Sequence, residues 1–174
     1  AVLAFFWAWY LNLPKSKKRQ FIQLRTRLSS VEAKFSQNVQ DSTDAWRLNI
    51  IDENEVTGIS VSILEQAKKR ARENKQNGWS VILDYPTYHS VITHAENRLI
   101  REKFYTAWST RASDQAEDIQ WNNEANVKTI LALRHKLANL VGYPNFAEYS
   151  LAKKMAGSTD EIVNFLEDLA QKTR

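Results

Sequence analysis

Cysteine is absent from the 174-residue chain, and glycine and proline are scarce, with four and three residues. Without cysteine there is no disulfide framework, no thiol nucleophile and no thiolate metal site. The few glycines and prolines leave long stretches free of helix breakers and supply too few turns for an all-β sandwich. The chain is therefore expected to be mainly α-helical, and the lack of cysteine fits a reducing, cytoplasmic compartment.

A strong charge of either sign is also lacking. Lys and Arg outnumber Asp and Glu by 24 to 20, which gives a net charge of +4, with both signs interspersed. The basic clusters at 15–19 and 68–72 accompany apolar helix positions, so solvated helix faces are favoured over nucleic-acid contact. Three of the six tryptophans lie in apolar contexts that favour packing over base stacking: Trp7, Trp9 and Trp79. No nucleic-acid partner is predicted.

The one long uncharged run, residues 1–13, is too short to cross a membrane. It ends at Pro14, well below the roughly 20 residues that a bilayer requires. It has no basic leader and no convincing cleavage site for a signal peptide. We interpret it as a buried helix of a larger fold or as sequence foreign to the fold, with no membrane partner. Because the chain has no initiating Met and no cap after Arg174, we expect it to be part of a longer protein.

Apolar residues recur at steps of three and four after Pro14, a pattern that predicts one helix over residues 16–44. Its buried face should comprise Phe21, Leu24, Leu28, Val31 and Phe35. Such a length is typical of a helical bundle or scaffold, and a short coiled-coil seam is the alternative. Trp46–Ile50 and Ser80–Leu83 have the composition of strands and are expected to form a two-stranded antiparallel sheet.

Further helices follow from periodicity and capping residues. One contains Val61 to Ala71 and should end at a left-handed cap formed by Gly78; one or two run from Pro86 to about Thr110, and another ends before Gly142 and Pro144. Two short helices begin at the capping pairs Asn145 with Glu148 and Ser158 with Glu161. The last one carries Ile162, Phe165, Leu166, Leu169 and Ala170 on one face. Residues 14–174 thus form one helical segment without repeats or linkers.

No complete set of catalytic residues is found in the sequence. His89 and His94 are five residues apart, about 140° around a helix, whereas HExxH places its histidines four apart on one face. His135 is followed by Lys136 and has no such partner either. Surface or core packing is therefore favoured for each histidine. There is no glycine-rich phosphate loop and no G-x-S-x-G, although an acid–base pair of carboxylates brought together by the fold stays open.

Several spaced blocks nevertheless resemble the thimet-oligopeptidase family of zinc metallopeptidases. These are LSSVEAKFSQNVQDSTDAW at 28–46, REKFYTAWSTRASDQ at 101–115 and ILALRHKLANLVGYPNFAEYSLAKKMA at 130–156. The similarity covers about residues 13–174, whereas residues 1–10 do not match. The resemblance implies a large, mainly helical two-domain enzyme whose deep, narrow channel admits short peptides. Its zinc lies on an HExxH helix with a further glutamate ligand, all C-terminal to this region, so no metal or catalytic residue is assigned here.

The resemblance thus implies a non-catalytic segment, inactive and zinc-free by itself, whose partners are the catalytic remainder of the same protein and short peptides. Candidate substrate-channel residues are the polar members of the 105–115 block: Tyr105, Arg111, Ser113 and Asp114. Arg111 and Asp114 are close enough in sequence to pair, and Ser113 or Asp114 can cap backbone amides. A structural turn lock is favoured over direct substrate contact. A stand-alone helical scaffold protein is the alternative function, and a basic nucleic-acid binder a weaker one.

Overall fold

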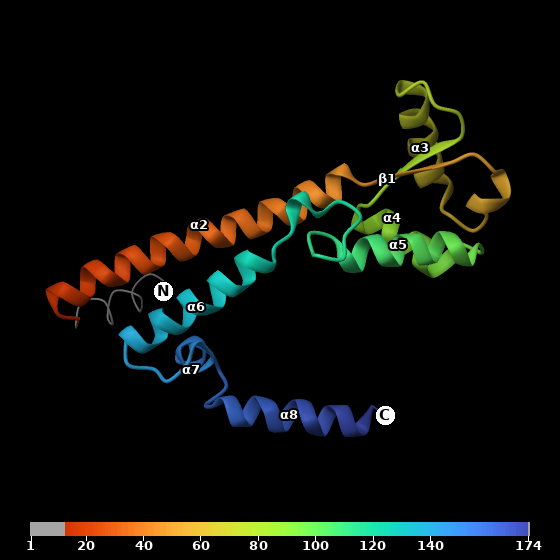
Figure 1. The fold of residues 1–174 in the computed structure, drawn as a ribbon. Coiled ribbons are helices and arrows are strands. Elements are labelled where there is room, and N and C mark those ends of the chain that lie inside the picture. The colour runs from red at the N-terminus through yellow and green to blue at the C-terminus, as the bar shows by residue number, and fades with distance from the viewer. Residues whose placement is uncertain (1–12, 174) are drawn as a thin grey trace. The chain divides into compact units, whose positions relative to one another are not determined.

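A computed structural model describes residues 13–173, so the apolar run lies outside the described residues except for Leu13 (Figure 1). The described part contains seven α-helices and one two-stranded sheet, which confirms the mainly α prediction. The chain divides into two compact units. Residues 34–125 form one, and the described residues 13–33 and 126–173 form the other. Among residues 13–173, no helix combines the length and apolar character that a bilayer crossing requires.

The first helix of the described residues, α2 (Lys15–Ala45), confirms the helix predicted from the apolar stripe. It starts directly after Pro14, whose carbonyl accepts a hydrogen bond from the Lys18 amide at 2.9 Å. On the predicted face, Phe21 and Leu28 are buried, and the other three positions are half-buried. The stripe is therefore covered along its length, as a helix inside a larger fold requires.

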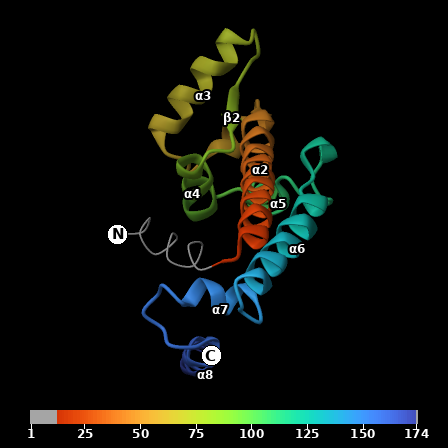
Figure 2. The same ribbon diagram turned by 90° about the vertical axis from the view of Figure 1, so that its left-hand side faces the viewer.

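The 34–125 unit is built around the predicted sheet. Strands β1 (Arg47–Ile50) and β2 (Trp79–Ile82) pair antiparallel, with Leu48 opposite Val81. Helix α3 (Val61–Glu73) packs against β2, as Figure 2 shows, and a short 3-10 helix (Glu53–Val56) precedes it. One residue from each strand, together with residues of the neighbouring helices and loops, forms a common core: Ile50, Val56, Ile59, Ala67, Val81, Leu83, Val91, Ala95, Ile100 and Phe104.

The predicted glycine cap of α3 is wrong. The helix ends at Glu73, Asn74 follows as its cap, and Lys75 takes the left-handed conformation with φ 57°. Gly78 has φ 82°, but it is required by the sheet and not by α3. A Cβ atom at this position would lie 2.0 Å from the Ile50 carbonyl oxygen. The glycine lets the β2 end of the chain approach β1.

Two helices, α4 (Tyr85–His94) and α5 (Arg98–Thr110), complete this unit and pack on each other. Asp84 caps α4 by accepting a hydrogen bond from the Thr87 amide at 2.8 Å, with Pro86 in the first turn. Asn97 caps α5 by accepting from the Leu99 amide at 2.9 Å. These caps explain why one apolar stretch is divided into two helices.

The other unit contains most of α6 (Glu124–Leu140) together with α7 (Phe146–Leu151) and α8 (Thr159–Lys172). The predicted caps are present: Asn145 accepts from the Glu148 amide at 2.9 Å and Ser158 from the Glu161 amide at 3.2 Å. Arg134 on α6 pairs with Glu32 on α2 at 2.6 Å. The apolar residues of α8 are exposed apart from half-buried Ile162: Val163, Phe165, Leu166 and Leu169.

Candidate functional site

The segment that joins α5 to α6, residues 111–123, is closed at its base. The Ala112 amide donates a hydrogen bond to the Ser42 hydroxyl on α2 (3.1 Å), and the Asn123 amide donates to the Ala112 carbonyl (2.9 Å). All three residues are buried. Ala112 has φ 54°, a left-handed conformation that costs a non-glycine residue roughly 1 kcal/mol or more. Tertiary contacts therefore hold the base of this loop in place.

A second anchor lies one turn earlier on α2. The Asn38 side-chain amide donates to Asn123 Oδ1 at 3.0 Å, and the Asn123 side-chain amide donates to the Phe35 carbonyl at 3.0 Å. Asn38 Oδ1 is buried and has no hydrogen-bond partner within the described residues. Buried amides are costly unless they are paired. The two asparagines thus fix where the loop returns to α2.

Arg111 is held by an aromatic side chain, and no carboxylate among residues 13–173 forms an ion pair with it. Its guanidinium carbon lies 3.8 Å from the centroid of the Trp108 ring, and its Nη1 donates to the Trp108 carbonyl. Tyr88 stacks on Trp108 with ring centroids 4.6 Å apart. Burial lowers the pKa of Arg111, and the charge of the Tyr88 phenolate would act in the opposite direction. The guanidinium stays charged at neutral pH in any case, so the contact is a cation–π interaction.

The other three predicted residues have different surroundings. The Ser113 hydroxyl donates to the Thr110 carbonyl at 2.6 Å and accepts from the Gln115 amide at 3.1 Å, so it caps the turn. Asp114 is exposed, and in the described part of the chain no ion pair joins it to Arg111. Tyr105 is 60% exposed on α5. Arg111 and Ser113 thus stabilise the turn, while Tyr105 and Asp114 face solvent.

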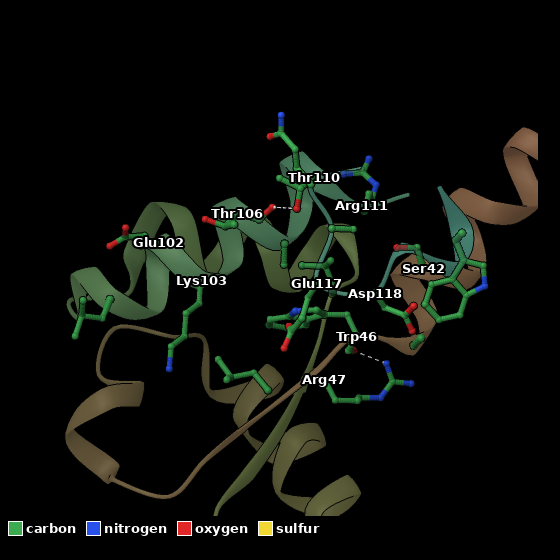
Figure 3. Close-up of a pocket in the computed structure, with 18 residues that line it drawn as sticks. Ser42, Trp46, Arg47, Glu102, Lys103, Thr106, Thr110, Arg111, Glu117 and Asp118 are labelled. Atoms are coloured by element: carbon green, nitrogen blue, oxygen red, sulfur yellow. Dashed lines mark hydrogen bonds between the residues drawn. The ribbon is translucent and has the colours of Figure 1, made fainter. Parts of the chain in front are cut away.

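A groove of about 920 Å³ lies beside this loop within the 34–125 unit (Figure 3). Its apolar surface includes Trp46, Leu48, Leu83, Ala107 and Trp121. Three cationic and three anionic side chains also line it: Arg47, Lys103, Arg111, Glu102, Glu117 and Asp118. Of the four predicted site residues, only Arg111 is part of this lining.

Metal-binding side chains do not gather in the described part of the chain. No group of three or more His, Asp or Glu residues is close enough there to hold an ion. His89 and His94 on α4 and His135 on α6 are exposed. The described residues therefore do not fit the zinc site that the family resemblance implies.

Comparison with known proteins extends over nearly the whole chain. The sequence model of Peptidase family M3 matches residues 91–174. Oligopeptidase A of Salmonella typhimurium is 42% identical over 165 residues, which make up 94% of this chain and 24% of that protein. Oligopeptidase A of Escherichia coli is 41% identical over the same shares. The organellar oligopeptidase A of Arabidopsis thaliana is 37% identical over 91% of this chain and 20% of its own length.

This chain belongs to peptidase family M3. The family resemblance carried by the spaced sequence blocks is thereby confirmed. The M3 chain spans 24% of the length of each of the two bacterial relatives. Within it, α5 and the 111–123 loop fall inside the family match, whereas β1 and β2 precede it.

Sequence reasoning missed most of the groove in this M3 chain. Trp46 and Arg47 come from the α2–β1 junction, and Glu117 and Asp118 from a polar stretch without periodicity. The tryptophan content was the available signal, but tryptophans pack in cores as readily as they line sites. Only the tertiary fold brings residues 42–48 beside residues 99–121.

Proposed function

We propose that this chain is a non-catalytic segment of a cytoplasmic zinc metallo-oligopeptidase that hydrolyses short peptides. The observation that carries the proposal is the 42% identity to an oligopeptidase A across 94% of the chain. A family M3 match over residues 91–174 supports the same reaction class. The zinc ion and the residues that activate water are proposed to lie in the remainder of the complete protein, because the described residues offer no ligand set. No hydrolytic step is therefore assigned to this chain.

The activity is tested on the complete protein with a fluorescence-quenched short peptide. Cleavage is expected to be abolished by a chelator and restored by added zinc, because the metal supplies the Lewis acid of the reaction. A folded protein substrate should stay intact. Chelator-insensitive cleavage, or a complete coding sequence without HExxH, would contradict the proposal and favour the helical scaffold instead.

We also propose that α5 and the 111–123 loop contribute to the wall of the substrate channel. Arg111 and Ser113 make the contacts that rigidify the turn, and exposed Tyr105 and Asp114 are the groups available to a substrate. Loops held by a rigid scaffold commonly carry binding residues.

The substitution Tyr105→Ala in the complete enzyme tests whether α5 contributes to the wall of the substrate channel. We expect a several-fold lower kcat/KM at an unchanged unfolding midpoint, because an exposed ring contributes little to packing. Tyr85→Ala is the control, since Tyr85 is a similarly exposed tyrosine (63%) on the neighbouring helix. Equal kcat/KM for wild type and Tyr105→Ala would remove this residue from the channel.

A further inference from the structure

Positive charge is concentrated in one of the two units, although the net charge of the chain is only +4. In the 34–125 unit, 14 Asp and Glu outnumber 11 Lys and Arg. In the other unit, residues 13–33 and 126–157 hold 11 Lys and Arg but only two acidic residues. We call these two stretches the basic region; they include the N-terminal part of α2, most of α6 and all of α7. The fold thus separates charges that are mixed in the sequence.

Many cations of the basic region are not neutralised within the unit. Of its two acidic residues, Glu32 pairs with Arg134 at 2.6 Å, and the Glu148 carboxylate accepts a hydrogen bond from the Thr159 hydroxyl. Six exposed cations form no ion pair with another residue of the described chain: Lys15, Lys17, Arg19, Arg27, Lys136 and Lys154. An anionic partner would therefore be attracted without breaking an existing ion pair of these side chains.

The densest cluster of cations lies at the start of α2. Four of the five residues at 15–19 are Lys or Arg, and the first turn of the helix contains no acidic residue. The N-terminus of a helix carries a partial positive charge, so the backbone adds to the attraction of these side chains for an anion. Lys15, Arg19 and Ile22 are four and three residues apart and therefore share one face of α2. Because Ile22 is 50% exposed, this face presents an aliphatic side chain beside two cations.

Exposed aliphatic side chains favour a lipid surface over other anionic partners. Besides Ile22, Leu131 and Met155 of the basic region are 59% and 104% exposed. No aromatic side chain among residues 13–33 and 126–157 is exposed, so these residues lack the stacking platform that single-stranded nucleic acids use. Aliphatic side chains among Lys and Arg are typical of helices that lie on the surface of an anionic bilayer.

We propose that the basic region attaches the protein to the surface of an anionic lipid bilayer. Lys15, Arg19 and Arg27 contact the lipid headgroups, and Ile22 reaches the boundary with the acyl chains. A membrane partner was not expected from the sequence, because the apolar run at 1–13 is too short to cross a bilayer. Attachment to the surface requires no crossing and depends on α2 instead. The inference goes beyond the proposed peptidase activity and concerns where the protein acts.

Binding is measured by sedimentation of the purified 174-residue chain with lipid vesicles. Vesicles of phosphatidylcholine with about one third phosphatidylglycerol should bind the chain at least about tenfold more tightly than vesicles of phosphatidylcholine alone. Salt at about 0.5 M should weaken the binding to the anionic vesicles, because it screens the charges. The run at 1–13 is uncharged, so attachment through its apolar side chains would not distinguish the two kinds of vesicle.

Two triple variants with the same change in net charge locate the surface that binds. Lys15→Glu/Arg19→Glu/Arg27→Glu should weaken binding to the anionic vesicles by at least about fiftyfold, because each cation near such a bilayer contributes about fivefold. The control replaces one Lys and two Arg at exposed positions of the 34–125 unit and should weaken binding by less than about fivefold: Arg72→Glu/Arg98→Glu/Lys103→Glu. Circular dichroism shows that both variants are folded.

A further variant tests the aliphatic contact. Ile22→Ser keeps every charge and should weaken binding by about threefold or more, because less apolar surface leaves water. The proposal is overturned if the chain does not bind anionic vesicles, if it binds both kinds of vesicle equally, or if the two folded triple variants bind alike. Binding of poly(U) RNA or polyglutamate in place of vesicles would also overturn it. Since no cleavage is measured, such a failure leaves the proposed peptidase activity untouched.

Discussion

Asn38 is a buried polar residue whose removal should be felt by the whole 111–123 loop. It is 4% exposed and donates to Asn123 at 3.0 Å. We expect Asn38→Ala to lower the free energy of unfolding by about 1–3 kcal/mol, because Asn123 loses a buried donor. Gln37→Ala, at the adjacent exposed position, should change it by less than about 0.5 kcal/mol. Urea unfolding followed by circular dichroism compares the two variants. Equal unfolding midpoints would show that Asn38 does not anchor the 111–123 loop.

Arg111 stabilises the turn after α5 through Trp108. Arg111→Ala removes the cation–π contact and the hydrogen bond to the Trp108 carbonyl, so a loss of about 1–2 kcal/mol is expected. Arg111→Lys keeps the charge but not the planar group, and should lose part of this energy. Thermal unfolding measures the loss. In the complete enzyme, kcat/KM of the folded variant should stay near wild type; a lower kcat/KM at unchanged stability would instead place Arg111 on the substrate path.

Tyr149 makes stability depend on alkaline pH. It is 9% exposed and packs edge-on against Tyr143, with ring centroids 5.6 Å apart. Burial raises its pKa, with Arg25 acting in the opposite direction. The folded state therefore favours the neutral phenol, and above pH about 10, the usual tyrosine pKa, the unfolded chain releases this proton first. Stability should fall from there until the folded-state pKa is passed.

The measurement is the unfolding midpoint at about pH 9 and about pH 11. Tyr149→Phe removes the titrating group and should show a smaller decrease between these values than wild type. Tyr105→Phe changes an exposed tyrosine and should behave as wild type. Identical decreases in all three proteins would assign the alkaline loss to other groups.

At the scale of elements, the sheet depends on the close approach at Gly78. Gly78→Ala would place a Cβ atom 2.0 Å from the Ile50 carbonyl oxygen, at φ 82°. Gly142 has a comparable φ of 94°, but a Cβ there would meet no atom within 4 Å. Both variants lose about 1 kcal/mol or more to the left-handed backbone, and Gly78→Ala should lose at least about 1 kcal/mol more. Chemical unfolding of both variants gives the difference in their free energies of unfolding. Equal losses would show that the close approach of β2 to β1 does not require a glycine at position 78.

The same elements show how far the sequence alone leads. The apolar stripe of α2 and the caps of α7 and α8 are local signals, so their prediction is confirmed. The end of α3 was misplaced, because Gly78 is required by a carbonyl on another strand and not by its own helix. The groove could not be predicted, since Ser42 and Ala112 are 70 residues apart in sequence and only the fold joins them. Hydrophobic periodicity carries no information about such pairs.

For the whole molecule, the family M3 membership leads to a prediction about the chain by itself. The purified 174-residue chain should bind zinc weakly and should not cleave a short peptide, because its described residues bring no ligand set together. Metal analysis after dialysis and a fluorescence-quenched peptide assay measure both properties. Stoichiometric zinc retained through dialysis, or chelator-sensitive cleavage, would contradict the assignment of a non-catalytic segment.

The hydrogen bonds at the base of the 111–123 loop also bear on the order of folding. Asn38 and Asn123 are 85 residues apart, and their bond closes a long loop of chain. Closing long loops costs entropy before any contact is gained, so such contacts form slowly. The helices need only local contacts and can form first. During synthesis, α2 emerges well before residue 123 exists, and the groove is therefore expected to be among the last features of the 34–125 unit to appear.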